Sequence, residues 1–178
     1  MNSKTIIIAF TAAVLALASC TKQSLKTAYN NQEDKIDKYI TSLTDKDPSL
    51  RVVHSNGAHK VISVEGTGEE LTKSGSVAFY YAGYTFNGSI SANSMFATNH
   101  QETAEAAKWT VDTEIKTVNM SKPDILDGLY EGLVGVREGE ECMILFSGEF
   151  GFGKKPLGTV PANSALAFHI WVVSVNND

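Results

Sequence analysis

The chain has 178 residues, of which 43% are hydrophobic and 20% are charged, and its net charge is −5. This length suits one domain with a flanking extension, and this composition supports a packed core rather than a disordered chain. An acidic chain with no basic cluster is not typical of proteins that bind nucleic acids, so we expect no nucleic-acid partner.

The first twenty residues have the pattern of an export signal. Lys4 precedes an apolar run, Ile6–Leu17, that is short for a membrane span and fits a secretory signal peptide. The segment Leu17-Ala18-Ser19-Cys20 resembles the lipobox of bacterial lipoproteins, in which signal cleavage leaves a lipid-bearing cysteine as the new N-terminus. The resemblance implies a signal peptide at residues 1–19 and lipid on Cys20. It also implies a location in the bacterial cell envelope, anchored to a membrane and facing the periplasm or the exterior. An ordinary signal peptide with a chance cysteine is the alternative.

Two segments lie between the signal and the main domain. Residues 20–30 are polar and predict a tether. In Asn31–Leu43, apolar side chains recur at helical spacing and acidic residues occupy the first turn, which predicts a short amphipathic helix followed by a turn that ends at residue 49. This helix can dock on its own domain or pair with a second copy as a homodimer, and the pattern does not decide between the two.

Residues 50–178 read as strands with a single short helix among them. Two β-prone runs flank Asn56-Gly57 and predict a hairpin, in which His54 and His59 are solvated turn residues rather than metal ligands. Further strands are predicted over Ser76–Phe86, Trp109–Val118, Cys142–Phe146 and Ser164–Val175, and the helix over Pro123–Leu133. The strands are too closely spaced for βαβ units. This order predicts an α+β fold in which an antiparallel sheet wraps around the helix.

Two of the predicted strands carry a clear alternation. In Trp109–Val118, Trp109 and Ile115 fall on one side, together with Val111 and Thr113. In Ser164–Val175, the even-numbered residues from Leu166 to Val172 face one way, and His169 faces the other, where we expect a structural role.

No motif for a phosphate loop, a metal site or a nucleophile elbow is present in the chain. Cys142 lies within an apolar run and is expected to be buried and inert. The carboxylates of Glu138, Glu140 and Glu141 cluster in a charged turn, where we expect them to be solvated rather than catalytic. Any catalysis should therefore need no cofactor and no covalent nucleophile.

Several short motifs between about Lys73 and Val175 resemble the FKBP-type peptidyl-prolyl cis–trans isomerases. Their order and spacing carry the resemblance, and the strongest are DGLYEGL at 127–133, REGE at 137–140, FGFG at 150–153 and VPANSAL at 160–166. Weaker matches are YYAG at 80–83 and MFATN at 95–99. The resemblance implies a bent antiparallel sheet around one short helix, with an apolar pocket between them, in agreement with the α+β pattern.

The resemblance also implies which residues form the pocket. By position in the motifs, the residues that act on the bound proline would be Tyr81, Phe96, Leu126, Phe152, Val160 and Phe168. Further substrate contacts would come from Trp109, Ile125, Leu129 and Ala97. In this family, the backbone N–H at the Leu126 position helps to hold the ligand, and the resemblance implies no cofactor and no metal.

The implied activity is isomerisation of X-Pro bonds in exported polypeptides, whether unfolded or folded. An X-Pro bond prefers the trans form only slightly, but a high barrier separates the two isomers. At the barrier the amide is twisted and its carbonyl carries less negative charge. An apolar pocket disfavours the polar planar amide relative to this twisted state, and can lower the barrier without an acid or a base.

Three positions differ from the family pattern. Ala97 stands where an acidic residue is common, Phe152 where many members have a tyrosine that donates a hydrogen bond, and Leu129 where many have a tryptophan at the pocket floor. These differences favour a second hypothesis, in which the domain is a weakly active or inactive chaperone or binding module of the cell envelope. A third is an envelope assembly protein that uses the Asn31–Leu43 helix as a partner surface.

Overall fold

The computed structural model describes residues 3–177, with the side chains of residues 22–177. Three α-helices are α1 (Ser3–Lys46), α2 (Gln101–Ala107) and α3 (Asp127–Leu133), and two short 3-10 helices are η1 (Ala92–Ser94) and η2 (Gly148–Phe150). The strands are β1 (Arg51–Ser55), β2 (Ala58–Val64), β3 (Ser76–Phe86), β4 (Met95–Thr98), β5 (Lys116–Asn119), β6 (Glu141–Phe146) and β7 (Ala165–Asn176).

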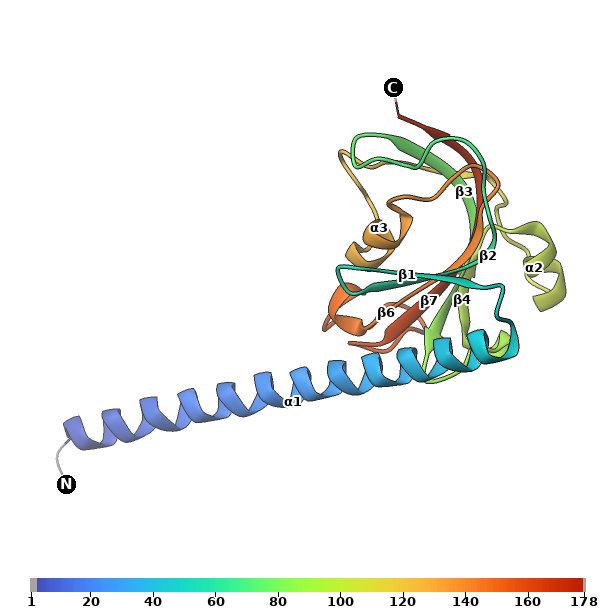
Figure 1. Cartoon of the computed structure of the whole chain (residues 1–178). Coiled ribbons are helices and arrows are strands. Elements are labelled where there is room, and N and C mark those ends of the chain that lie inside the picture. The colour runs from blue at the N-terminus through green and yellow to red at the C-terminus, as the bar shows by residue number, and fades with distance from the viewer. Residues whose placement is uncertain (1–2, 178) are drawn as a thin grey trace.

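The strands form one antiparallel sheet in the order β1-β2-β6-β7-β3-β4, with β5 also paired to β3. β3 and β7 form the longest ladder, which runs from Ser76 opposite Asn176 to Phe86 opposite Ala165 and contains a register shift between Ala78 and Phe79. The sheet bends around α3, which lies on its concave side, while α2 lies on the outside (Figure 1). This arrangement confirms the predicted α+β fold.

The core lies between the sheet and α3. The predicted alternation in β7 is confirmed, because Leu166, Phe168, Ile170 and Val172 are all buried in this core. His169 lies on the opposite face, where its ring stacks on Trp171 at a centroid distance of 4.0 Å.

Two glycines allow α3 to lie close to the sheet. A Cβ atom on Gly128 would overlap the ring of Phe146, and one on Gly132 would overlap the side chain of Ile144. These glycines are four residues apart and therefore share one face of the helix. The helix begins at Asp127 rather than at Pro123 as predicted, because Leu126 has an extended backbone with ψ of 145°.

Helix α1 is longer than expected and docks on its own domain. Residues 20–30, predicted as a tether, are helical, since they contain neither glycine nor proline to stop the helix. Ile36 and Ile40 are buried in a second apolar cluster with Val61, Leu145 and other residues on the outer face of the sheet. The apolar face of Asn31–Leu43 is thus occupied by the domain, which is the first of the two alternatives given by the sequence. The N-terminal part of α1 projects beyond the domain (Figure 1).

Two charged groups are more buried than the sequence indicated. His59, expected in solvent at the hairpin turn, places its Nε2 atom 2.8 Å from the Glu33 carboxylate of α1, so that docking of α1 shields it. Glu140, expected to be solvated, is 1% exposed and lies 3.5 Å from the Nζ atom of buried Lys60. Both corrections come from partners distant in sequence.

Among the residues searched for such a segment, which are those that the structure describes, no helix is both long and apolar enough to cross a membrane. The side chain of Cys20 lies outside the described residues, so the expected lipidation is not tested by the structure.

An apolar pocket as the candidate functional site

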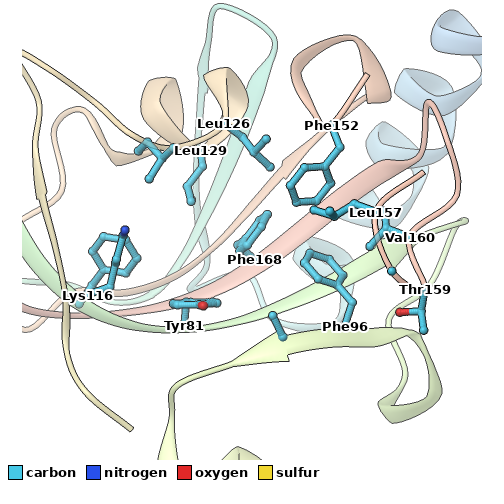
Figure 2. Close-up of a pocket in the computed structure, with 14 residues that line it drawn as sticks. Tyr81, Phe96, Lys116, Leu126, Leu129, Phe152, Leu157, Thr159, Val160 and Phe168 are labelled. Carbon is cyan, nitrogen blue, oxygen red and sulfur yellow. The ribbon is translucent and has the colours of Figure 1, made fainter. Parts of the chain in front are cut away.

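An apolar pocket of about 470 Å³ opens between α3 and the concave face of the sheet. It is lined by residues of β3, β4, β5, α3 and β7 and by the loops that follow β5 and β6 (Figure 2). The lining residues are Phe79, Tyr81, Phe96, Ala97, Lys116, Ile125, Leu126, Leu129, Phe152, Leu157, Gly158, Thr159, Val160 and Phe168. Every residue predicted for the pocket is in this set except Trp109.

Aromatic rings in edge-to-face contact form the sheet side of the pocket. The ring of Phe96 lies 5.8 Å from that of Phe168 and 5.9 Å from that of Phe152, nearly perpendicular to both. Such contacts add stability beyond the burial of their area and hold the rings in fixed orientations. Gly83 of β3 makes room for them, since a Cβ there would lie 2.8 Å from Phe96 and 2.9 Å from Phe168. The pocket shape is thus built from packing and does not require a ligand.

Buried polar residues fix Tyr81 in place. The backbone N–H of Tyr81 donates to Asn99 Oδ1 at 2.6 Å, and its carbonyl accepts from the hydroxyl of Thr98 at 2.7 Å. Asn99 also donates through Nδ2 to the carbonyl of Glu114 at 2.8 Å, which ties the end of β4 to the segment that leads into β5. Both Thr98 and Asn99 are buried, so these bonds are shielded from competition with water.

The backbone N–H of Leu126 and the hydroxyl of Tyr81 are among the polar groups at the pocket that have no partner within the described part of the chain. Leu126 lies on the helix side of the pocket and Tyr81 on the sheet side (Figure 2). Ala97, where FKBP members often carry an acid, offers the Tyr81 hydroxyl no acceptor. Both groups remain available to a ligand.

Trp109 is not part of the pocket, contrary to the prediction. Lys108 adopts a left-handed backbone with φ of 58° at the end of α2, and the N–H of Trp109 bonds back to the carbonyl of Ala104. This turn leaves the indole 38% exposed. The segment before it forms helix α2.

The strand predicted over Trp109–Val118 is shorter and opposite in phase. Only Lys116–Asn119 pairs with β3. Ile115, expected on the inner side, is 39% exposed, whereas Val118 is buried in the core and Lys116 lines the pocket. A shift of one residue moves every side chain of a strand to the other face, which explains both the exposure of Ile115 and the position of Lys116 in the pocket.

Five lining residues were not predicted: Phe79, Lys116, Leu157, Gly158 and Thr159. Phe79 stands two residues before Tyr81 on the same strand, so the period of two placed it on this face. Leu157, Gly158 and Thr159 belong to the Pro/Gly-rich loop before Val160, which reaches the pocket rim. Leu157 is 55% exposed there and extends the apolar surface outward.

Among the described residues that line the pocket, the ionisable ones are Tyr81 and Lys116. Among the described residues, no Asp, Glu, His or Cys lines it. Cys142 is buried in the core as expected, and burial, with the nearby Glu140, raises the pKa of its thiol far above the usual range. It is therefore not a reactive thiol. His169 is held outside the pocket by Glu141 at 2.8 Å, and burial lowers its pKa.

The sequence model for the FKBP-type peptidyl-prolyl cis-trans isomerases matches residues 68–173. The chain belongs to this family. The matched region of the FKBP domain spans β3 to β7 and includes every residue that lines the pocket. The family resemblance of the motifs is confirmed.

Curated relatives share the family at modest identity. The FKBP domain is 23% identical over 120 residues to FK506-binding protein 1 of Aspergillus oryzae, which covers 67% of this chain and 99% of that protein. The chain is 22% identical over 162 residues to the peptidyl-prolyl cis-trans isomerase Mip of Chlamydia muridarum, covering 91% of this chain and 58% of that one. Similarity to FkpA of Buchnera aphidicola is 25% over 124 residues, covering 69% of this chain and 42% of the relative. The chain thus spans about half the length of both bacterial relatives.

Solved structures share the fold. FkpA from Escherichia coli superposes with a TM-score of 0.57 at 19% identity, covering 99% of this chain and 74% of that one. A peptidyl-prolyl cis-trans isomerase from Pseudomonas syringae gives a TM-score of 0.59 at 14% identity, covering 85% and 95%. At these identities the likeness supports the FKBP fold alone.

Proposed function

We propose that this FKBP-type domain isomerises X-Pro peptide bonds in exported polypeptides, using the apolar pocket. The observation that carries the proposal is the convergence of nine family positions on one cavity, which two unpartnered hydrogen-bond donors face. Packing alone would bury apolar side chains but would leave no open cavity between them.

The proline ring fits between the aromatic rings and Leu129. Apolar walls exclude water and solvate a planar, polar amide poorly, whereas the twisted amide of the transition state carries less charge on its carbonyl oxygen. The pocket therefore lowers the free energy of the transition state relative to the bound ground state. This step needs no proton transfer, because it is a rotation about the C–N bond.

The two free donors would orient the substrate backbone. The N–H of Leu126 can donate to a substrate carbonyl on the helix side, and the hydroxyl of Tyr81 can donate on the sheet side. Many FKBP members have a donating tyrosine where this chain has Phe152, and we assign the donor role to the hydroxyl of Tyr81 instead. One such bond contributes about 1 kcal/mol to binding.

The proposal is tested by the rate of cis–trans exchange in a Leu-Pro peptide, measured with residues 21–178. We expect acceleration above the uncatalysed rate, and a loss of roughly tenfold or more in Phe168→Ala, which removes a ring that contacts Phe96 and Tyr81. Val173→Ala is the matched control, because Val173 lies on the same strand but is 42% exposed. A rate equal to the background at micromolar enzyme would overturn the proposal.

A second candidate is a binding module with little catalysis. Leu157 at the pocket rim is exposed and offers apolar surface to a client. Leu129 stands where many members have a tryptophan, so the pocket floor is formed by a smaller and more flexible side chain. This candidate predicts suppression of aggregation of an unfolded client without acceleration of the Leu-Pro exchange. Loss of the suppression in Leu157→Ser would support it.

We also propose that Cys20 carries lipid and anchors the domain to a membrane of the bacterial envelope. The lipobox-like segment supports this, and the helical backbone of α1 continues from Cys20 into the docked part of the helix. As a helix, the segment rises about 14 Å from Cys20 to Tyr29, whose hydroxyl donates to Asn163 of the domain. Cys20→Ala should release the protein from membranes, and continued membrane association in carbonate washes would contradict lipidation.

A further inference from the structure

Lys116 places a positive charge in an otherwise apolar pocket. It is the first residue of β5, opposite Phe79 of β3, and it is the one charged residue among the described residues that line the pocket. Figure 2 shows its ammonium at the end of the pocket near Leu129 and Tyr81, away from the end formed by Phe152 and Leu157.

This ammonium has no partner in the part of the chain that the structure describes. Within the described residues, no ion pair or hydrogen bond links the side chain of Lys116 to another residue. Three other basic side chains of the domain are paired: Arg51 with Glu65, Arg137 with Glu70, and Lys60 with Glu140. An unpaired lysine at a ligand pocket of a chain with net charge −5 is therefore not explained by pairing within the fold.

Ala97 strengthens the imbalance of charge. It lines the same pocket from β4, and FKBP members often have an acidic residue at its position. With a methyl group there, no carboxylate of the described lining residues offsets Lys116. The pocket therefore carries the positive charge of Lys116 and lacks the negative charge that FKBP members often have at the Ala97 position.

We propose that Lys116 selects polypeptides with an aspartate or glutamate next to the proline. This inference rests on the proposed isomerase function and specifies its substrate class. The proline would occupy the apolar part of the pocket, and the neighbouring carboxylate would pair with the Lys116 ammonium. The flexible four-carbon stem of lysine lets the charge reach a side chain on either side of the proline.

The apolar surroundings favour such a pair over one in open water. Rings and aliphatic side chains lower the local polarity, which strengthens the attraction between opposite charges and weakens its screening by salt. The ammonium is only partly shielded, so its cost of desolvation in the free protein is small. We expect an effect of roughly three- to tenfold in kcat/KM, between that of an exposed and a buried pair.

The test compares six peptides that differ only beside the proline. Three carry Glu, Gln or Leu before it, and three carry the same residues after it. For the wild-type chain, kcat/KM for Glu should exceed that for Gln roughly three- to tenfold at one of the two positions, and 0.5 M NaCl should reduce this preference. Lys116→Met, which keeps the length but not the charge, should remove the preference, and Lys116→Glu should reverse it.

Lys122→Met is the matched control, because Lys122 is exposed and lies just beyond the same strand, outside the pocket. It should retain the preference in full. Equal rates for Glu and Gln at both positions, with Leu-Pro still isomerised, would overturn the selection by Lys116 and leave the isomerase function standing. No acceleration of any of the six peptides would overturn both.

Discussion

Gln32 of helix α1 is hydrogen-bonded to Asn163, which lies in a loop at the pocket. Its side-chain Nε2 donates to the Asn163 carbonyl at 2.8 Å, while its Oε1 accepts from the backbone N–H of Gly148 at 2.8 Å. The N–H of Asn163 in turn donates to Gly153 at 2.7 Å. One amide therefore holds together the loop that carries Phe152 and the loop that carries Val160, from the side opposite the pocket.

Replacement of Gln32 by alanine should loosen both loops. Two hydrogen bonds are lost, which we expect to reduce the free energy of unfolding by about 1–2 kcal/mol. Because the rim side chains then sample more positions, KM for a Leu-Pro peptide should rise more than kcat falls. Urea unfolding and steady-state kinetics measure the two effects.

Lys38→Ala serves as the control for Gln32→Ala, since Lys38 lies on the exposed side of the same helix. It should leave both measurements within error of the wild type. If Gln32→Ala lowered stability without any change in KM, α1 would support the fold but not the pocket.

Close packing of α3 on β6 depends on Gly128. Alanine is favoured over glycine within a helix by about 1 kcal/mol, so propensity alone predicts that Gly128→Ala is stabilising. A Cβ at this position overlaps the ring of Phe146, which stacks on Phe168 at 5.9 Å. We expect a net loss of about 1–3 kcal/mol in urea unfolding, as for other overpacked cores.

The same change should reach the pocket, because displacement of Phe146 pushes on Phe168. A reduced rate of X-Pro exchange is expected in Gly128→Ala even at temperatures where the variant is folded. A stabilised variant with normal activity would mean that α3 can shift away from the sheet at no cost.

The parts of this fold that were predictable share one property, which is that their signal is local. The alternation in β7 and the helical spacing of α3 indicate which face is buried, and the order of the motifs predicted which residues line the pocket. Lys116 was missed because only Lys116–Asn119 pairs with β3, so that the alternation counted from Trp109 did not mark the residues that face the pocket. The helix predicted at Asn31–Leu43 was shorter than α1, because the polar residues 20–30 were predicted to be a tether although they are helical.

Glu140 was assigned to solvent for a similar reason. Its turn is charged, but its partner, Lys60, comes from β2, far away in the sequence. Lys60 also donates to the carbonyl of Val134 at 3.4 Å, at the end of α3. Within the described residues, neither carboxylate oxygen of Glu140 accepts a hydrogen bond, so the lysine charge is what compensates this buried group.

Removal of the lysine alone should therefore be severe. Lys60→Met leaves a buried carboxylate without a counter-charge, and we expect a loss of about 3–5 kcal/mol in the free energy of unfolding. The double variant Lys60→Met, Glu140→Met replaces the pair by apolar side chains of similar length and should regain most of this loss. Urea unfolding of the two single variants and the double variant gives the coupling energy. Losses that simply add would show that the two charges do not stabilise each other.

Docking of α1 should depend on pH through Glu33. Burial acts to raise the pKa of this carboxyl, but the neighbouring His59 and Ser147 outweigh it, so that its pKa lies below the ordinary value. A group whose pKa is lowered by folding stabilises the folded state above its unfolded pKa of about 4.3. This stabilisation is lost as the pH falls through the lower, folded pKa.

Thermal unfolding of the wild type and of Glu33→Gln between pH 7 and pH 3 tests this dependence. The variant should unfold at a lower temperature at pH 7, because glutamine keeps the shape but not the charge that faces His59 at 2.8 Å. The difference should begin to shrink below about pH 4.3, where the unfolded chain binds a proton at Glu33, and should vanish below the lower pKa of the folded state. Asp45→Asn, on an exposed position of the same helix, should follow the wild type throughout. A constant difference between wild type and Glu33→Gln across the range would show that the Glu33 charge does not hold α1 in place.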